Sequence, residues 1–415
     1  MSHILTYLDL DGETRKVGDA YFTFRRNRLT ASFSYERDYL SAQGAYAVDP
    51  ALRLSAGSWP LPYGLPGAFS DAAPDRWGRG LIAKRLRATA SAEGRPLPAL
   101  DDRDYLLGVS DETRQGALRF KTDAAGEFQH PAPEVPKLIA LPSLLHAATV
   151  VARDEPDNLA AIKTLLDAGT GSLGGARPKA SVQDGDRLLI AKFPHPSDGW
   201  SVMRWEMTAL DLAESAGIPV PNRRLIGIEG HAVLLLDRFD RHRAGRVGYI
   251  SAMTLLEARD GESRDYTEIA EAIPEHSSAT NDDLRQLWRR IAFSVAVHNT
   301  DDHLRNHGFL RGRAGWRLAP AFDLNPNPDL AARRVTSIGG ADNPADDLRA
   351  LIMYAPTFGL TDAQARATLR EVADATSGWE ARARGNGIAA AEIERFRPTL
   401  SHTIEATARA SQPNA

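Results

Sequence analysis

The chain has 415 residues, of which 43% are hydrophobic and 25% charged, and this length exceeds what a single hydrophobic core usually supports. It contains no cysteine, which excludes disulfides, thiolate metal sites and a cysteine nucleophile. The formal net charge of −4 gives no overall attraction to nucleic acid, and the sequence shows neither a signal-peptide pattern nor an apolar run of membrane-spanning length. We therefore expect a cytoplasmic protein of two or three packed units that does not associate with a membrane.

Short strands joined by turns are expected at the beginning of the chain. Residues 4–8, 20–24 and 29–35 alternate apolar with β-branched or aromatic side chains and are separated by Asp and Gly, which is typical of hairpins. A helix is expected next, capped by Ser70 or Asp71 and running to about residue 87. The first unit is thus predicted to be small and β-rich, with a helical appendage.

Helical and strand patterns alternate in the middle of the chain. A helix is expected near residues 159–166, strands at 187–193 and 231–236, and a helix at 202–216 between these strands. From residue 281 onward the pattern is mostly helical. We expect three regions, which comprise residues 1–115, 116–280 and 281–415.

The most informative segment is the polar cluster at residues 298–308. Apolar residues recur at helical spacing from Leu284 to Val295, so one helix face delivers this cluster to a loop. Asp301 and Asn306 have the spacing of a kinase catalytic loop, in which the Asp orients the substrate hydroxyl and the Asn holds Mg²⁺. Asp323 ends an apolar, strand-like run and is a candidate metal ligand. Taken singly, such acids are more often solvated loop residues or helix caps.

A Gly-rich segment, residues 169–179, supplies small residues and backbone N–H groups suited to phosphate, although it lacks the spacing of a Walker A loop. Lys192 interrupts the apolar strand that follows, where kinases place an ammonium on the nucleotide phosphates. Glu206 lies on the apolar stripe of the next helix and needs a cation, for which Lys192 is the candidate. Asp237 ends the later strand and could offer a carboxylate to ribose. Each of these features also has an ordinary explanation, as a turn, a surface lysine, a half-exposed Glu or a strand end.

Taken together, these segments resemble the HipA-type serine/threonine kinase toxins of bacterial type II toxin–antitoxin systems. The residues that carry the resemblance are 172–179, 192–194, 237–241, 300–306 and 322–323, together with Pro74-Asp75-Arg76-Trp77-Gly78-Arg79 near the N-terminus. The resemblance implies a two-lobed, protein-kinase-like α+β fold with an N-terminal β-rich subdomain and a mostly helical C-terminal lobe. Residues 116–280 would then contain the phosphate loop and the ATP lysine, and residues 281–415 the catalytic loop.

The resemblance also implies roles for individual residues, with ATP and Mg²⁺ as cofactors. Asp301, Asn306 and Asp323 would be catalytic, with Asn306 and Asp323 holding the metal. The nucleotide-binding residues would be Ser172, Gly174, Gly175, Ala176, Lys179, Lys192, Asp237, Phe239, Asp240 and His303. Ser172 corresponds to the family's inhibitory autophosphorylation position. The sequence departs from the family pattern at Asp237, where Glu is common, and after Asp323, where Leu-Asn replaces Phe-Gly.

The partners implied by the resemblance are a protein substrate, such as an aminoacyl-tRNA synthetase, and a helix-turn-helix antitoxin. DNA would be contacted only through the antitoxin, and the biological setting would be bacterial persistence.

Two other functions remain open from the residues alone. A metal-dependent hydrolase could use His298, Asp301, Asp302, His303 and His307, since mixed His and carboxylate sites bind transition metals. That hypothesis leaves the Gly-rich segment and the strand lysine unexplained. Alternatively, the chain could be a pseudokinase that acts as a scaffold for an antitoxin–DNA complex.

Overall fold

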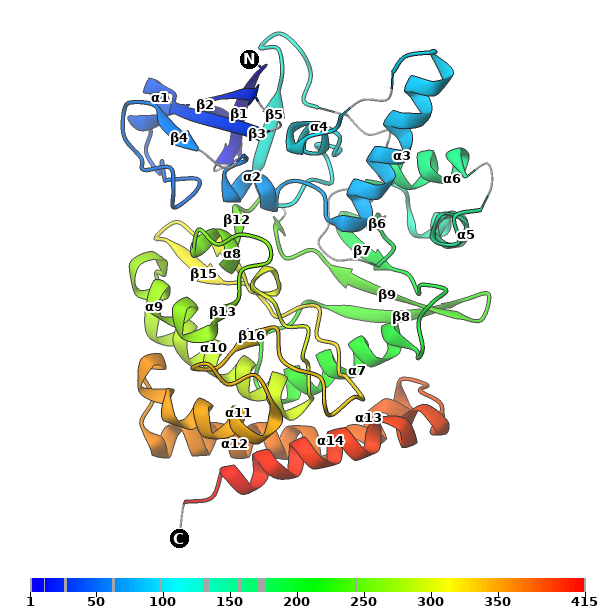
Figure 1. Cartoon of the computed structure of the whole chain (residues 1–415), viewed down its shortest axis with the longest axis vertical. Coiled ribbons are helices and arrows are strands. Elements are labelled where there is room, and N and C mark those ends of the chain that lie inside the picture. Colours follow the sequence, from blue (N-terminus) through cyan, green and yellow to red (C-terminus); the bar gives the residue numbers. More distant parts are fainter. Residues whose placement is uncertain are drawn as a thin grey trace. The chain divides into compact units, whose positions relative to one another are not determined.

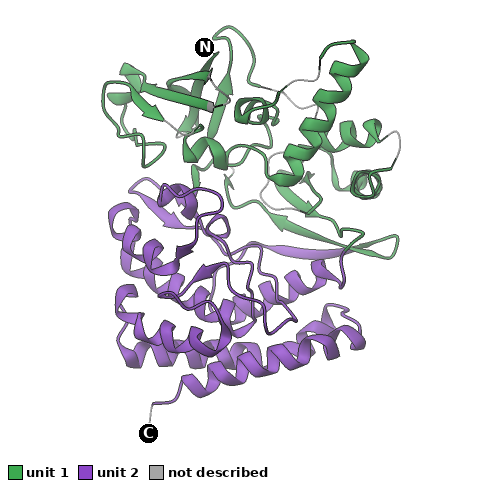
Figure 2. Cartoon of the chain, in the orientation of Figure 1, with its two compact units in different colours: residues 1–197, 227–250 green, residues 198–226, 251–415 purple. Residues whose placement is uncertain are grey.

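The computed structural model describes residues 2–10, 12–25, 28–61, 64–96, 99–129, 134–155, 158–169, 177–242 and 245–413. Two compact units divide the chain (Figure 2): residues 1–197 with 227–250, called the N-terminal unit here, and residues 198–226 with 251–415, called the C-terminal unit. The first is rich in strands and the second is mostly helical (Figure 1). This mixed composition confirms the expected α+β class.

The elements of the N-terminal unit are β1 (Ser2–Leu10), β2 (Glu13–Arg25), β3 (Arg28–Tyr35), α1 (Arg37–Leu40), β4 (Trp59–Leu61), α2 (Gly67–Asp71), α3 (Arg76–Ala92), α4 (Asp102–Leu107), β5 (Leu118–Lys121), α5 (Leu141–Ala152), α6 (Leu159–Asp167), β6 (Lys179–Asp184), β7 (Arg187–Lys192), β9 (His231–Asp237), β10 (Arg241–His242) and β11 (Gly245–Arg246). The boundaries between the two units along the sequence fall within two of the strands, which are β8 (Arg223–Ile228) and β12 (Tyr249–Ser251).

The elements of the C-terminal unit are α7 (Val202–Ser215), α8 (Ala252–Leu255), β13 (Arg264–Asp265), α9 (Tyr266–His276), α10 (Thr280–Ala296), β14 (Gly308–Arg311), β15 (Trp316–Leu318), β16 (Thr336–Ser337), α11 (Pro344–Met353), α12 (Asp362–Ser377), α13 (Trp379–Gly385) and α14 (Ala390–Ala410).

A five-stranded sheet with the order β4-β3-β2-β1-β5 forms the beginning of the chain. The pair Leu10↔Glu13 closes the first hairpin, and Gly12 takes a left-handed φ of 86° that favours glycine in a tight turn. Alternate residues such as Phe22, Phe33 and Phe120 are buried, as the period of a strand requires. The three strands expected from the alternating pattern are thus confirmed.

The predicted helix is present and runs through residue 87, but the cap predicted at Ser70 or Asp71 is wrong. Instead, α2 ends at Asp71 and α3 begins at Arg76, where Asp75 is the N-cap and its Oδ1 accepts a hydrogen bond of 2.7 Å from Gly78 N. Pro74 explains the break, because proline donates no backbone N–H and disfavours helical geometry in the residue before it.

A second sheet of the N-terminal unit contains the antiparallel neighbours β6, β7 and β9. Its register places Lys179 opposite Lys192 and Ala191 opposite Leu235. The buried residues of these strands include Val182, Leu189 and Leu234. The strands are therefore apolar segments in which the two lysines are the exceptions. The strands expected at 187–193 and 231–236, and the helix expected near 159–166, are confirmed to within one residue at each end.

In the C-terminal unit, the Glu392 carboxylate on α14 forms hydrogen bonds to the N-terminal end of helix α7. Glu392 accepts hydrogen bonds from Ser201 N at 3.0 Å, Ser201 Oγ at 2.8 Å and Trp205 Nε1 at 3.1 Å. The Trp205 ring also stacks on Phe396, with centroids 3.8 Å apart. Ser201 is the N-cap of α7, but its side chain makes no capping hydrogen bond to the helix backbone. Glu392, which is distant in the sequence, instead accepts hydrogen bonds at this helix end.

We expect Glu392→Ala to lower the free energy of unfolding by about 2–3 kcal/mol, because three donors lose a charged acceptor and the start of α7 loses its cap. Urea denaturation followed by tryptophan fluorescence measures this loss. The matched control is Glu394→Ala on the same helix, since its carboxylate is largely exposed and pairs only with Arg397 among the contacts of the described chain. Equal stability of the two variants would contradict the proposed role of Glu392.

Candidate functional site

The polar cluster at residues 298–308 follows a buried helix, as expected. Leu287, Trp288 and Ile291 of α10 are fully buried. The helix ends at Ala296, and His298 takes a left-handed φ of 51° while Asn299 N donates to Ser294 O at 2.8 Å. This backbone turn ends the helix and starts the loop that contains Asp301.

Within this loop, Asn306 holds the backbone of Asp301. Asn306 Nδ2 donates to Asp301 O at 3.1 Å, and Asn306 N donates to His303 O at 2.8 Å. The Asn306 side chain is buried, whereas Asp301 is exposed. An amide binds a hard cation through its oxygen, so Oδ1 is the atom of Asn306 that could hold one. The spacing of five residues therefore closes a compact loop with an exposed carboxylate at one end and an amide oxygen at the other.

The neighbouring acid, Asp302, points into the protein. Its Oδ2 accepts hydrogen bonds from Tyr266 Oη at 2.6 Å and Ser294 Oγ at 3.1 Å, and His307 Nε2 lies 3.1 Å from its Oδ1. Burial alone raises the pKa of this carboxyl, but the charge and hydrogen bonds of its partners, His307 first, lower it to about 2. Asp302 therefore anchors the loop, and this role was not apparent from the sequence.

Asp323 lies in a segment hydrogen-bonded to the same loop. Asn325 N donates to Asn299 Oδ1 at 3.3 Å, and Asn327 N donates to His298 O at 3.0 Å. Asp323 itself has a left-handed φ of 58°, which Asp tolerates better than most residues, and its Oδ1 accepts from Asn325 Nδ2 at 3.3 Å. The structure thus joins the segments that contain the predicted base and the predicted metal ligand.

The predicted strand leading into Asp323 is only partly correct. Strand β15 ends at Leu318, and residues 319–323 have no regular structure. Ala319 and Ala321 are buried all the same. Their apolar character therefore reflects burial of an irregular segment, which a short apolar run does not distinguish from a strand.

The carboxylate and amide oxygens of Asp301, Asn306 and Asp323 are hard donors of the kind that Mg²⁺ prefers. These three residues therefore fit a magnesium site chemically, and none of them is a soft ligand.

The histidines of the cluster do not gather into a metal site. His298 Nε2 lies 2.9 Å from Asp329 O, and burial lowers the pKa of His298, while His307 lies against Asp302. Across the described ranges, no group of three or more His, Asp or Glu side chains could hold a metal ion. The hydrolase hypothesis therefore finds no His-containing centre in this part of the chain.

In the N-terminal unit, Lys179 and Lys192 face each other across β6 and β7, and both are buried. Lys179 Nζ forms an ion pair of 2.7 Å with Asp75 Oδ2, and less than a tenth of either side chain is exposed. Asp75 is also the N-cap of α3, so it links that helix to the start of β6. Lys179 thus has a structural partner in Asp75, which no pattern in the sequence indicates.

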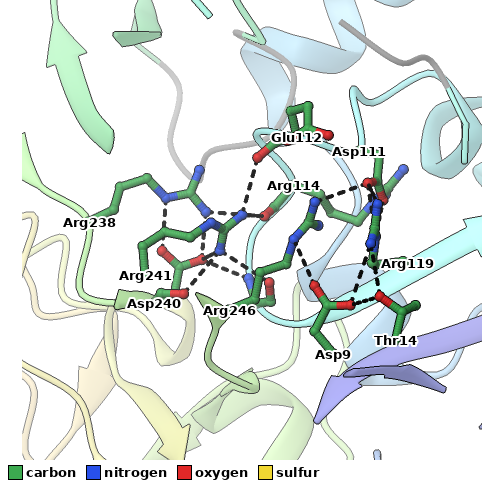
Figure 3. A network of polar contacts seen from close by, with 11 residues as sticks. Asp9, Thr14, Asp111, Glu112, Arg114, Arg119, Arg238, Asp240, Arg241 and Arg246 are labelled. Carbon is green, nitrogen blue, oxygen red and sulfur yellow. Dashed lines mark hydrogen bonds and ion pairs between the residues drawn. The ribbon is translucent and has the colours of Figure 1, made fainter. Parts of the chain in front are cut away.

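Three predicted nucleotide-binding residues, Asp237, Phe239 and Asp240, lie at or just after the end of β9 and differ in their contacts. Asp237 Oδ2 lies 3.2 Å from Arg187 Nη1, and Phe239 lies against Tyr249 with ring centroids 6.3 Å apart. Asp240 is buried in a network of arginines (Figure 3). All three remain predicted nucleotide-binding residues, although the contacts of Asp240 are structural.

Ser172, Gly174, Gly175 and Ala176 lie outside the described residues. Glu206 is described and fully buried on α7, as its place on the apolar stripe suggested. Lys192 and Glu206 belong to different units, so their pairing stays a prediction.

The model of the family described as the HipA-like C-terminal domain matches residues 171–379, which is more than half of the chain. The chain belongs to the HipA-like family. The matched range includes Lys179, Lys192, Asp301, Asn306 and Asp323, so the resemblance on which the sequence analysis relied is confirmed.

A solved structure shows the fold of this HipA-like chain over almost its whole length. The structure is that of the *Shewanella oneidensis* MR-1 toxin–antitoxin system, HipA and HipB with operator DNA. The likeness covers 98% of this chain and 96% of that one, with a TM-score of 0.69 and 15% identity. It confirms the expected two-lobed fold class, with a β-rich N-terminal region and a mostly helical C-terminal region.

A curated relative of the HipA-like chain comes from *Haemophilus influenzae* and has the name "Putative kinase". The two are 23% identical over 189 residues, which are 38% of this chain and 54% of the relative. The chain thus spans about half the length of that relative. In the described part of the HipA-like chain, no helix has both the length and the apolar character needed to cross a membrane.

Proposed function

We propose that this HipA-like chain is an ATP- and Mg²⁺-dependent protein serine/threonine kinase. The observation that carries the proposal is a set of hydrogen bonds that joins two segments. The segment that begins at Asp323 bonds to His298 and Asn299, at the start of the loop that Asn306 closes onto Asp301. Membership of the HipA-like family and the kinase name of the curated relative support it.

In the proposed reaction, Asp301 orients the substrate hydroxyl and accepts its proton, and its exposed carboxylate is accessible to a protein substrate. Asn306 Oδ1 and the Asp323 carboxylate would hold the magnesium ion. The ion, when bound, neutralises developing charge on the phosphates. Lys192 would contact the phosphates, with support from Lys179 and His303. Asp237 and Phe239 would contact the ribose and the base.

The experiment is incubation of the purified full chain with Mg²⁺-ATP, followed by mass spectrometry of the protein and of candidate substrates. We expect phosphoserine or phosphothreonine to form, and we expect none to form when EDTA is present during the incubation. A chain that binds Mg²⁺-ATP but transfers no phosphate to itself or to any protein of its host would favour the pseudokinase hypothesis. Metal-dependent hydrolysis without ATP would favour the hydrolase.

We further propose that the chain acts as the toxin of a toxin–antitoxin module in the cytoplasm. The Shewanella oneidensis HipA is found with HipB and operator DNA, which supports an antitoxin as the partner. The proposed antitoxin is a helix-turn-helix protein, through which alone the chain would contact DNA. An aminoacyl-tRNA synthetase is the proposed class of substrate. Growth arrest on expression, relieved by co-expression of the neighbouring gene, tests the module.

The Lys192→Ala variant should weaken ATP binding by about tenfold or more, because it removes a charged contact to the phosphates. The Glu206→Ala variant should act in the same direction but less. Isothermal titration with Mg²⁺-ATP measures both. Lys163→Ala, on helix α6, is the control for removal of a lysine charge. An unchanged affinity in Lys192→Ala would show that this lysine does not contact the nucleotide.

Ser172 is the proposed site of inhibitory autophosphorylation. A phosphate there adds about −1.5 to −2 charges next to the anionic phosphates of ATP, so the modified loop should exclude the nucleotide. We expect phosphate on Ser172 after incubation with Mg²⁺-ATP, and weaker ATP binding by Ser172→Asp than by Ser172→Ala. Parental ATP affinity in Ser172→Asp, with Ser172 unmodified, would remove the switch from the proposal.

A further inference from the structure

A segment of the C-terminal unit that follows the proposed metal ligand in sequence is hydrogen-bonded to the loop that contains the proposed base. Arg334 Nη1 donates to Asn299 O at 3.0 Å, and Val335 N donates to Thr300 O at 3.0 Å. Both acceptors are main-chain carbonyls that immediately precede the proposed base. The segment therefore fixes the course of the chain as it enters the loop.

Thr336 holds the same loop on the other side of Asp301. Its Oγ1 donates to Asp302 O at 2.7 Å, and Asn306 Nδ2 donates to Asp301 O at 3.1 Å. Together with the two bonds above, each main-chain carbonyl from residue 299 to residue 302 accepts a hydrogen bond. The main chain from which the exposed Asp301 carboxylate extends is thus fixed by four bonds.

The side chains of Arg334 and Thr336 are shielded from water. Arg334 is 5% exposed and Thr336 is 2% exposed, whereas Val335 between them is 54% exposed. This alternation is that of extended backbone, and β16 begins at Thr336, where it pairs in parallel with β13. A buried hydrogen bond is stronger than an exposed one because the local dielectric is low. The two side chains are therefore well placed to hold the loop.

Asp347 on α11 orients the guanidinium group of Arg334. Its Oδ2 accepts hydrogen bonds from Arg334 Nε at 3.3 Å and from Arg334 Nη2 at 3.1 Å, and the two side chains are 1% and 2% exposed. The guanidinium is planar, with its donors in fixed directions, so pairing two nitrogens with one carboxylate sets the direction of the third. That third nitrogen, Nη1, donates to Asn299 O. Arg334 therefore connects the loop to helix α11.

The other end of the segment is fixed to helix α9 by Asp265. Its Oδ2 accepts hydrogen bonds from Ser337 Oγ at 2.5 Å and Gly340 N at 2.9 Å, and its Oδ1 accepts one from Gly339 N at 3.0 Å. Asp265 is also the N-cap of α9. The residues that hold the loop are thus themselves held by two helices.

We propose that Arg334 and Thr336 are positioning residues that orient Asp301 toward the substrate hydroxyl. They act through the main-chain carbonyls of residues 299 and 302, and neither is proposed to contact the substrate or the nucleotide. The inference rests on the proposed function, because it takes Asp301 as the base. A base must lie within hydrogen-bond reach of the hydroxyl, and a displacement of about 1 Å can lower a rate about 100-fold.

The test compares two replacements of Thr336 in the full chain. Thr336→Val removes the hydroxyl and keeps the branched side chain, whereas Thr336→Ser keeps the hydroxyl. We expect kcat for phosphate transfer to fall about tenfold in Thr336→Val, as loss of one hydrogen bond implies, and to be largely restored in Thr336→Ser. The Kd for Mg²⁺-ATP should be parental in both. Transfer to the protein that the parental chain phosphorylates and isothermal titration are the two measurements.

Thr376→Val is the matched control for loss of a buried threonine hydroxyl. Thr376 is fully buried, and its Oγ1 donates to Val372 O at 2.8 Å within helix α12. This variant should lower stability comparably and retain the parental kcat. Equal values of kcat in Thr336→Val and Thr376→Val, or in Thr336→Val and Thr336→Ser, would overturn the inference.

A second measurement separates positioning of Asp301 from a general structural role. When Asp301 is already replaced by Asn, adding Thr336→Val should change the residual rate little, because the group that Thr336 positions is gone. A tenfold loss in both backgrounds would show that Thr336 acts independently of Asp301, and it would overturn the inference.

Arg334→Lys is the second variant and provides the same test if Thr336→Val does not fold. A lysine keeps a positive charge beside Asp347, but its single nitrogen replaces three donors in fixed directions. We expect kcat to fall about tenfold with a parental Kd for Mg²⁺-ATP, and a parental kcat would overturn the role of Arg334. A parental chain that transfers no phosphate would contradict the proposed function and this inference together, whereas the outcomes above contradict the inference alone.

Discussion

Replacing Asp301 by Asn is expected to lower the rate of phosphoryl transfer by about 100-fold to 10,000-fold, because in the proposed reaction the substrate hydroxyl loses the group that accepts its proton. Asp323→Asn should have an effect at least as large, since the proposed metal ligand loses its charge. The two variants should differ in one respect. Asp323→Asn should weaken binding of Mg²⁺-nucleotide more than Asp301→Asn does, because Asp301 acts on the hydroxyl.

Phosphate transfer and Mg²⁺-nucleotide affinity are the two measurements. Asp301 is exposed and Asp323 half-buried, so neither change should lower the unfolding temperature appreciably. Asp346→Asn is the matched control and should retain parental activity, because Asp346 is a half-exposed acid on α11 that pairs with Arg349. Near-parental turnover in Asp301→Asn or in Asp323→Asn would remove the kinase assignment.

The sequence was most informative where local pattern and chain order coincide. The strands around Phe22 and Phe33, and the buried helix before Asp301, follow from period-two and period-3.6 patterns, which depend only on which residues face the core. The spacing between Asp301 and Asn306 also has a local cause, because one hydrogen bond from the Asn side chain to the Asp backbone closes the loop. Such features need no knowledge of distant segments.

Other features depend on residues far apart in the sequence, and the patterns did not predict them. Glu392 caps a helix whose N-cap is Ser201, and Asp75 pairs with Lys179. The residues around each acid form no local pattern that indicates its partner. Likewise, Asp301 and Asp302 are chemically identical neighbours, and only the fold shows that one is exposed and the other buried.

The helix boundary at Asp75 could have been predicted from the sequence. Pro74 disfavours helical geometry at the preceding residue, and Asp75 precedes an apolar helical pattern, so the proline rule favours this cap over Ser70 or Asp71. The apolar run before Asp323 is a different case. Ala319 and Ala321 are buried in an irregular segment, and hydrophobicity reports burial without specifying backbone conformation.

Because Asp302 is buried and its neighbour Asp301 is exposed, we expect the two acids to differ in their contribution to stability. Asp302→Asn should destabilise the C-terminal unit by about 3 kcal/mol and lower its unfolding temperature by on the order of 10 °C. The physical reason is that Tyr266 and Ser294 lose a charged acceptor in a buried site, where His307 Nε2 also lies 3.1 Å from the Asp302 carboxylate. Differential scanning calorimetry of the apo chain measures the change, and Asp301→Asn is the control at the adjacent position.

The pH dependence of stability provides a second measurement of the same carboxylate. The pKa of Asp302 is lowered in the folded state to about 2, from an ordinary value of 3.8, so its charged form favours folding. This stabilisation is complete above about pH 4 and is lost as the pH falls toward 2. The parental chain should therefore lose stability more steeply than Asp302→Asn across this interval. Parallel curves and equal unfolding temperatures would show that the contacts of Asp302 do not stabilise the loop that contains Asp301.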